Sequence, residues 1–367
     1  MIKTIFFPYH LKYNPYCDLV VRILNSNNIQ TYKLSEALKH PFSILRHIKI
    51  INLNFYENID NNTPLIIEKI LFCLKRIMIS AFSFSGIKII YTMHNKMQHD
   101  AKYINDNLKN IEFLLKKANA IICLCSESSE YLKKDELIYS KVHLLSLPYY
   151  ETHYTEEDIT FSKSYKKSIC RNNEMLCVFI GTIAPYKNIE LIIECANKLK
   201  EKSIHFLIAG RFSSDSYKSE ITNGIISENI TIIDHFLTDE EMRTVILASD
   251  VMLFPFEKKS ALNSSSIMLT FAYERTCISP SIGTIKDISN GDKLFSYDYT
   301  TIEEHLTQLE CSIMRAYQIY IQDNEILHEY GKVLKEEIFE KSNPQALGEK
   351  YKKIYYELVG NSDELKR

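Results

Sequence analysis

The sequence predicts an α/β protein with two domains, each built on a parallel sheet. The chain has 367 residues, which fits two domains of ordinary size. Short apolar runs alternate with helical patterns in both halves, and this alternation is typical of parallel sheets. Between the halves, residues 152–173 are polar and charged without periodicity, so we expect an interdomain linker there.

The first half alternates strands and helices as far as Pro148. Its strongest strand signal covers residues 87–93 and ends at His94 and Asn95. Apolar runs predict strands over residues 4–8, 48–53, 87–93, 120–124 and 143–147. Helical patterns cover residues 18–25, 63–81 and 103–118, and Ser126 is expected to cap a further helix. We assign residues 1–155 to the N-terminal domain.

The same alternation starts again at residue 175. Apolar runs predict strands over residues 175–180, 205–209, 230–233, 251–254 and 276–279. Helical patterns cover residues 188–200, 239–248 and 264–273, with Thr238 as the cap of the second. From residue 302 the pattern is helical to the end. We assign residues 156–340 to the C-terminal domain and residues 341–367 to a final helical segment.

Composition and charge exclude several classes of protein. Hydrophobic residues make up 46% and charged residues 25%, which is ordinary for a globular protein. The formal net charge of −2 argues against a nucleic-acid partner. No run reaches the ~18 apolar residues that span a bilayer, and the first run is too short for a signal peptide. Nine dispersed cysteines without zinc-finger spacing indicate a reducing compartment, so we expect a cytoplasmic protein.

Residues 71–81 leave two interpretations open. Their apolar side chains are interrupted by Lys75 and Arg76. A core helix with two solvated cations is the preferred interpretation. The alternative is an interfacial helix that makes a peripheral contact with the inner membrane.

The glycine positions exclude two families of nucleotide-binding enzymes. No glycine precedes Gly86, so the first strand cannot lead into a Gly-x-Gly-x-x-Gly loop. The P-loop pattern is also absent from the sequence. The sequence contains no Asp-x-Asp pair, so we expect neither a bound metal nor a cofactor.

Three features of the second half could bind a phosphate. Lys187 stands at a helix start after a buried strand that ends in Gly181, and Arg211 follows the next strand. Hydroxyl side chains begin a further helix at Ser264, Ser265 and Ser266. Cations and helix N-termini both stabilise anions. Solvated surface cations and simple helix capping are the alternatives.

The order and spacing of these motifs resemble those of a known enzyme family. The motifs are Gly-x-Ile-x-Pro-Tyr-Lys-Asn from residue 181, Ile-Ala-Gly-Arg from 208 and Ala-Ser-Asp-Val-x-Leu-Phe-Pro-Phe from 248. The serine-rich helix start and Ser-Pro-Ser-Ile-Gly from residue 279 follow. Residues 177–283 thereby resemble bacterial glycosyltransferases of the GT-B fold, which assemble capsule, O-antigen and exopolysaccharide. The first half is similar mainly at residues 91–95.

The resemblance implies two Rossmann-like domains that face each other across a cleft, with C-terminal helices. The final segment, residues 341–367, is then expected to return to the N-terminal domain. The implied reaction is hexosyl transfer, without a metal, from a nucleotide-diphosphate sugar to a saccharide acceptor, which is expected to be lipid-linked. Gly181, Lys187, Arg211 and Ser264–Ser266 would bind the donor. The protein would work in the cytoplasm, with contact at the membrane face left open.

His94 resembles the cleft histidine of this family. With an ordinary pKa near 6.5, it could accept the acceptor's proton if the enzyme inverts. If the enzyme retains, it would instead hold the donor sugar by a hydrogen bond. We expect it opposite Lys187, with Asp100 as a candidate partner and Tyr16, Asn95 and His99 on the acceptor side.

Two alternative functions remain open. One is a GT-B-like sugar-nucleotide epimerase. The other is a non-catalytic subunit that binds a nucleotide sugar. Ala261 and Leu269 stand where many family members carry two glutamates, and Ala184 replaces a common arginine.

Overall fold

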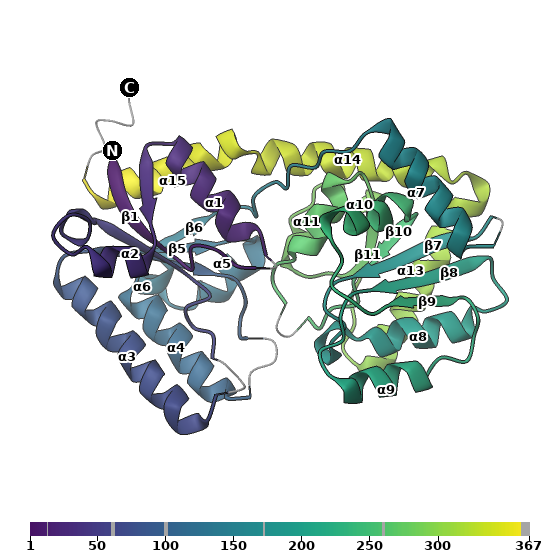
Figure 1. The fold of residues 1–367 in the computed structure, drawn as a ribbon, viewed down its shortest axis with the longest axis horizontal. Helices are drawn as coiled ribbons and strands as arrows, with labels where there is room; N and C mark the ends of the chain where they lie inside the picture. The colour runs from purple at the N-terminus through teal and green to yellow at the C-terminus, as the bar shows by residue number, and fades with distance from the viewer. Residues whose placement is uncertain (13, 60–62, 99–101, 172, 259–260, 361–367) are drawn as a thin grey trace. The chain divides into compact units, whose positions relative to one another are not determined.

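The computed structural model describes residues 1–12, 14–59, 63–98, 102–171, 173–258 and 261–360 (Figure 1). The chain divides into two compact units. The N-terminal unit comprises Met1–Pro148, Lys259–Ser265 and Lys341–Arg367. The C-terminal unit comprises Tyr149–Lys258 and Ser266–Glu340.

The N-terminal unit is built on a six-stranded parallel sheet of order β2-β1-β3-β4-β5-β6. Its strands are β1 Ile2–Phe7, β2 Ile29–Tyr32, β3 Ile50–Asn54, β4 Lys88–Met93, β5 Ala120–Cys123 and β6 Val142–Leu144. Its helices are α1 Tyr16–Ser26, α2 Leu34–Lys39, η1 Leu45–His47, α3 Leu65–Phe84, α4 Ile104–Lys117, α5 Ser126–Leu132, α6 Glu136–Tyr139 and α15 Pro344–Leu358.

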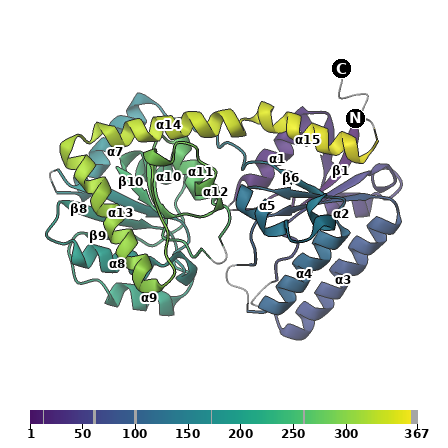
Figure 2. The same cartoon turned by 180° about the vertical axis from the view of Figure 1, so that it is seen from behind.

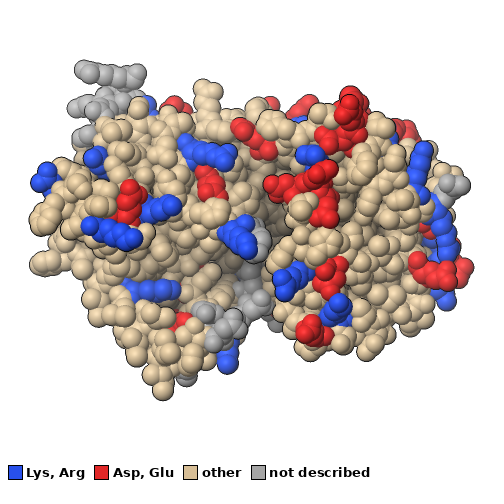
Figure 3. All heavy atoms as spheres, viewed as in Figure 1, with Lys and Arg blue, Asp and Glu red and all other residues tan. Residues whose placement is uncertain are grey.

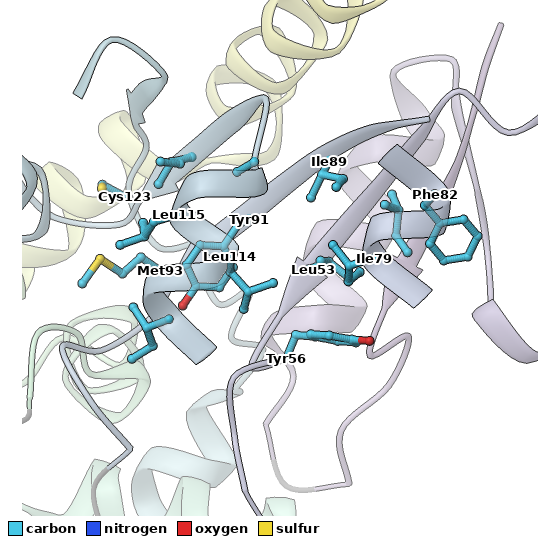
Figure 4. Packing of buried hydrophobic residues seen from close by; sticks show 14 of the residues in the cluster. Leu53, Tyr56, Ile79, Phe82, Ile89, Tyr91, Met93, Leu114, Leu115 and Cys123 are labelled. Atoms are coloured by element: carbon cyan, nitrogen blue, oxygen red, sulfur yellow. The ribbon is translucent and has the colours of Figure 1, made fainter. Parts of the chain in front are cut away.

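Helices cover both faces of this first sheet (Figures 1 and 2). On one face, α3 and α4 pack side chains such as Ile79, Phe82 and Leu114 against Leu53 and Ile89 of the strands (Figure 4). On the other face α15 lies beside α1, and Asn52 Nδ2 donates a buried hydrogen bond of 2.9 Å to Tyr355 Oη. The final helix therefore completes the N-terminal core.

The C-terminal unit is built on a second six-stranded parallel sheet, of order β12-β11-β10-β7-β8-β9. Its strands are β7 Met175–Ile180, β8 Ile204–Ala209, β9 Ile230–Ile233, β10 Val251–Leu253, β11 Thr276–Pro280 and β12 Phe295–Tyr297. Its helices are α7 Glu156–Ile169, η2 Pro185–Lys187, α8 Ile189–Lys198, α9 Asp215–Asn223, α10 Asp239–Ala248, α12 Gly283–Lys286, η3 Gly291–Lys293 and α13 Ile302–Gln322. Two further helices join residues of both units: α11 Ser265–Ala272 and α14 Glu325–Ser342.

The predicted fold class, α/β with two parallel sheets and C-terminal helices, is confirmed. The compact units divide at 148/149 and 340/341, compared with predicted domains of 1–155, 156–340 and 341–367. No sequence pattern predicted that residues 259–265 join the N-terminal unit. The cleft between the domains stays a prediction.

Two local predictions were wrong. The expected linker of residues 152–173 contains helix α7, which starts with reciprocal hydrogen bonds between Thr155 and Asp158 and packs against α10. Ser162 is the one fully buried side chain of α7, so the helix lacks apolar periodicity in the sequence. Ser126 does not cap α5: the cap is Cys125, whose side chain and backbone both pair with Ser128.

Candidate functional site

Two glycines bring the ends of β7 and β8 into direct contact in the C-terminal unit. Gly181 and Gly210 have φ angles of 132° and 154°. A Cβ atom on Gly210 would lie 1.8 Å from the backbone oxygen of Gly181. Only glycine fits this close approach, and both glycines stand at the carboxyl edge of the sheet, where α/β proteins bind ligands.

The segments beyond these glycines stay paired. The backbone nitrogen of Ile183 donates to the oxygen of Arg211, and that of Ser213 donates to the oxygen of Ile183, both at 2.9 Å. Asn188 Nδ2 donates to the oxygen of Pro255, which follows β10, at 2.7 Å. The structure therefore joins the Lys187 loop to the Arg211 segment and to the chain beyond β10.

Lys187 ends the short helix η2, directly before α8. Its Nζ lies 4.0 Å from the ring centroid of Phe256 and 5.0 Å from that of Tyr186. Cation–π contacts of this length hold the ammonium group close to the sheet edge. Phe256 was not predicted as a site residue. It stands in the Phe-Pro-Phe motif, so that motif was the available signal.

A cavity of about 570 Å³ opens beside Arg211. Its walls include the segment beyond β8, the start of α9 and the segment beyond β9. Side chains that line it include Arg211, Ser213, Ser214, Lys218, Asp234 and Phe236. Lys187 is not among the lining residues.

The cavity lining combines two cations, Arg211 and Lys218, with two carboxylates, Asp215 and Asp234, and an aromatic wall. The Arg211 guanidinium lies 5.7 Å from the ring centroid of Phe236. Lys218 pairs with Asp234 at 2.6 Å, and this contact raises the pKa of the lysine and lowers that of the aspartic acid. Ser214 caps α9 by accepting from the nitrogen of Tyr217. Cations beside a helix N-terminus suit an anion, and a flat ring suits an aromatic ligand.

Among the lining residues, Arg211 was predicted from the sequence and the others were not. They come from two loops and from α9, which has too polar a composition to be predicted as a helix. The signal that could have found them is position. Residues 234–236 follow β9, and β9 pairs in parallel with β8, so both loops lie at one edge.

The three serines stand at the start of α11, as predicted. The helix begins at Ser265, and Ser264 is buried. Ser264 and Ser265 belong to the N-terminal unit, whereas Ser266 belongs to the C-terminal unit. That these serines bind the same phosphate as Lys187 and Arg211 stays a prediction.

In the N-terminal unit, His94 follows the carboxyl end of β4 and is 5% exposed. Its ring stacks on Phe55 at 3.7 Å with 17° between the planes, and the edge of Tyr16 packs against it at 4.8 Å. Its Nε2 lies 3.2 Å from Asn54 Oδ1. Asn54 donates through Nδ2 to Asn52 Oδ1, so its Oδ1 is an acceptor and His94 Nε2 carries the proton.

Burial lowers the pKa of His94 to about 3. The expectation of an ordinary value near 6.5 was therefore wrong, because the charged imidazolium would lose its water without gaining an anionic partner. At neutral pH the ring is uncharged and a very weak base. The arrangement suits a hydrogen-bonding group better than a general base.

The residues expected on the acceptor side have different surroundings. Tyr16 is 1% exposed, so its side chain is part of the core and supports the His94 ring. Asn95 is half-buried, and its Oδ1 has no hydrogen-bond partner among the described residues. Asn263 donates through Nδ2 to the backbone oxygen of His94 at 3.0 Å, and its Oδ1 likewise has no partner in the described part. His99 and Asp100 lie outside the described residues.

Asn95 Oδ1 and Asn263 Oδ1 are among several buried side-chain atoms without a partner in the described residues, as is Asn229 Oδ1 in the C-terminal unit. Asn95 follows His94 in sequence, and Asn263 is bonded to His94. Hydroxyl groups of a ligand could donate to both oxygens. Asn95 was predicted from the sequence. Asn263 was not, because residues 259–265 follow β10 of the other sheet in the chain.

Comparison with known proteins finds a family match over part of the C-terminal unit. Residues 161–261 match the family model described as Glycosyl transferases group 1. This segment contains Gly181, Lys187, Arg211 and the lining residues of the cavity. A search of curated proteins found no match to the chain.

Solved structures share the fold over most or all of the chain. A glycosyltransferase from Rickettsia africae ESF-5 superimposes with a TM-score of 0.69 at 13% identity, covering 98% of this chain and 99% of its own. HepE from Anabaena, in complex with UDP and glucose, gives 0.67 at 10% identity and covers 100% of both chains. TarM from S. aureus gives 0.55 at 14% identity, covering 73% of this chain and 50% of its own.

Because these identities are low, the superpositions establish the GT-B fold and nothing about activity. The similarity to group 1 glycosyltransferases at the level of sequence is limited to residues 161–261. Of the resemblance seen in the sequence, the fold is confirmed. Its narrower content, a role in surface polysaccharide assembly, stays a prediction.

Proposed function

We propose that this protein transfers a sugar from a nucleoside-diphosphate sugar to a saccharide acceptor. The observation that carries the proposal is the joined edge of β7 and β8, where the Lys187 loop, Arg211 and the cavity meet within the group 1 segment. The solved structures of HepE include complexes with UDP and with UDP-glucose, which supports a nucleotide-sugar donor here.

The chemistry requires a leaving diphosphate to gain charge as the bond to the sugar breaks. In the proposed mechanism, Lys187 and Arg211 stabilise this charge together with the start of α11, which carries Ser264–Ser266. Charges fixed before the reaction lose little energy to reorganisation, so they can stabilise the transition state effectively. The nucleoside would occupy the cavity, with its base against Phe236. Because the sequence lacks an Asp-x-Asp pair, the proposed mechanism needs no metal.

His94 is proposed to hold a sugar by a hydrogen bond. In its neutral form with the proton on Nε2, Nδ1 carries the lone pair and can accept from a sugar hydroxyl. A His94 pKa of about 3 is compatible with this hydrogen-bonding role. It is not compatible with removal of a proton from the acceptor at neutral pH. The acceptor's proton would then leave with the donor phosphate. The Oδ1 atoms of Asn95 and Asn263 would accept hydrogen bonds from further hydroxyl groups of the sugar.

The proposal extends to hexosyl transfer onto a lipid-linked saccharide in surface polysaccharide synthesis, on the cytoplasmic side of the membrane. This extension rests on the sequence resemblance. The alternative of a non-catalytic binding subunit is favoured by one observation: Ala184 and Ala261 are buried where the family commonly carries charged side chains.

The experiment is mass spectrometry of the purified full chain with a panel of nucleotide sugars. The proposal expects release of the nucleoside diphosphate, with transfer to an added saccharide or slow hydrolysis. Arg211→Ala should reduce that release, whereas Arg171→Ala, which replaces an exposed arginine away from the cavity lining, should not. Binding of a nucleotide sugar without turnover would favour the non-catalytic subunit. Recovery of an isomerised nucleotide sugar would favour an epimerase.

A further inference from the structure

Helix α3 packs Ile79 and Phe82 into the core and exposes a second set of apolar side chains. Ile66 is 75% exposed, Ile77 is 64% exposed and Phe84 is 95% exposed. The outward side carries a continuous row of apolar side chains, which we call the α3 face: Ile66, Ile67, Ile70, Leu71, Leu74, Ile77 and Phe84. The row extends over about 27 Å at 1.5 Å per residue. Figure 3 shows few charges on the surface over α3.

Glu68, Lys75 and Arg76 of α3 contact the protein, whereas Lys69 is exposed. Lys75 Nζ donates to the backbone oxygens of Tyr56 and Asn58, at 3.2 and 2.9 Å. Arg76 donates to the backbone oxygen of Lys109 on α4 at 2.6 Å. Glu68 is buried. The preferred interpretation of the sequence, a core helix with two solvated cations, agrees with the packing of Ile79 and Phe82, but Lys75 and Arg76 are partly exposed and hydrogen-bonded to backbone oxygens.

An exposed apolar face of this size indicates a binding partner. Soluble proteins rarely expose continuous apolar surface, and such patches mark contacts with proteins or membranes. None of the described helices is long and apolar enough to cross a bilayer, so α3 would lie along a surface rather than through it.

Charge around the α3 face indicates which partner fits. Residues 31–120 contain thirteen Lys or Arg and seven Asp or Glu, a net charge of +6 in a chain whose formal charge is −2. Exposed cations flank the face on α3, on α4 beside it and at the start of β4: Lys69, Lys88, Lys109, Lys116 and Lys117. Glu112 is exposed among them and pairs with Lys116 at 2.6 Å.

The neighbouring segment has the same character. Residues 34–48 share a core cluster with the last turns of α3, through Ala37 and Ile48 on one side and Ile79 and Phe82 on the other. This segment exposes Phe42 together with Lys39 and Arg46. Apolar side chains among cations are the pattern of an interfacial helix on anionic lipid.

We infer that the α3 face docks this protein onto a lipid surface that contains anionic headgroups. The apolar row inserts at the boundary between headgroups and acyl chains, and the flanking lysines contact the headgroups. A second copy of the chain is a poorer partner, because a two-fold contact sets the same surface against itself and would bring these cations together. The inference does not depend on the proposed glycosyl transfer.

The test is sedimentation of the full chain with vesicles of phosphatidylcholine alone and of phosphatidylcholine mixed with phosphatidylglycerol. We expect binding to the mixed vesicles that weakens with salt, and about tenfold less binding to phosphatidylcholine. The triple variant Ile70→Ser, Leu74→Ser, Ile77→Ser should lose about tenfold or more of the bound fraction. Its substitutions are at exposed positions, and its unfolding curve should match the wild type.

The matched control replaces exposed apolar residues of the C-terminal unit by serine: Phe161, Ile226 and Ile321. This control should bind like the wild type. Absence of wild-type binding to mixed vesicles, or equal binding by the α3 variant, would overturn the inference. The inference would also be overturned if light scattering showed the wild type as a dimer and the α3 variant as a monomer, with no vesicle binding by either.

Discussion

The buried imidazole of His94 makes the stability of this protein sensitive to acid. Its pKa is about 3 in the folded chain, against an ordinary value of 6.5 in an unfolded one. Between these values the unfolded chain binds more protons, so the free energy of unfolding falls as the pH falls below 6.5. At pH 4.5, about two units below the pKa of the unfolded chain, this effect lowers the free energy of unfolding by about 2–3 kcal/mol.

The variant His94→Gln removes this linkage and keeps an amide that can donate to Asn54. We expect wild type to lose about 2–3 kcal/mol more than the variant between pH 7 and pH 4.5. Urea unfolding of both proteins at each pH, followed by circular dichroism, measures the difference. His235→Gln serves as the control, because that ring is half exposed and surface substitutions change stability by less than about 0.5 kcal/mol. Parallel losses in wild type and His94→Gln would refute the reasoning that burial holds His94 neutral.

Three further predictions concern the site. Gly210→Ala should destabilise the C-terminal unit by about 2 kcal/mol or more in thermal unfolding, since its Cβ would meet the Gly181 oxygen; Gly291→Ala, with open space around it, is the control. His94→Ala should keep nucleotide affinity in calorimetry yet lose about 10²-fold in transfer rate, and near-normal turnover would remove His94 from the site. Transfer should continue in the presence of a chelator, and loss that Mg²⁺ or Mn²⁺ restores would contradict the proposed mechanism.

Elements with strong local signals could be predicted from the sequence. The strand Ile230–Ile233 and the helix Asp239–Ala248 have the bounds that were predicted. In the helix, Thr238 and Glu241 pair reciprocally at the start, and such a capping box is visible in a sequence. Strand β7 is fully buried and therefore reads as an unbroken apolar run.

Elements stabilised by tertiary contacts could not be predicted. Strands β2 and β12 are four and three residues long and gave no separate signal. Helix α7 exposes most of its side chains, so its polar sequence resembles a linker. The α3 helix was predicted, but its orientation was not, because a pattern of apolar residues does not say which side faces the protein.

Site residues could be predicted from the sequence where the backbone conformation requires a particular residue type. They could not be predicted where tertiary packing determines the environment of the side chain. Gly181 and Gly210 ended predicted strands, and the structure explains both by their contact. The burial of His94 depends on Phe55, Tyr16 and Asn54, which come from other elements. The motif therefore located His94 in the sequence, but the lowering of its pKa by burial could not be predicted from the sequence.

The most direct measurement of the central claim is calorimetric titration of nucleoside diphosphates into the full chain and its variants. The account predicts binding that Lys187→Ala and Arg211→Ala each weaken by about 1.5–3 kcal/mol, the range for a hydrogen bond to a charged group. Arg171→Ala should leave the affinity unchanged. Absence of binding by the wild type, or equal affinity in both site variants, would contradict the claim that this edge of the second sheet binds the donor.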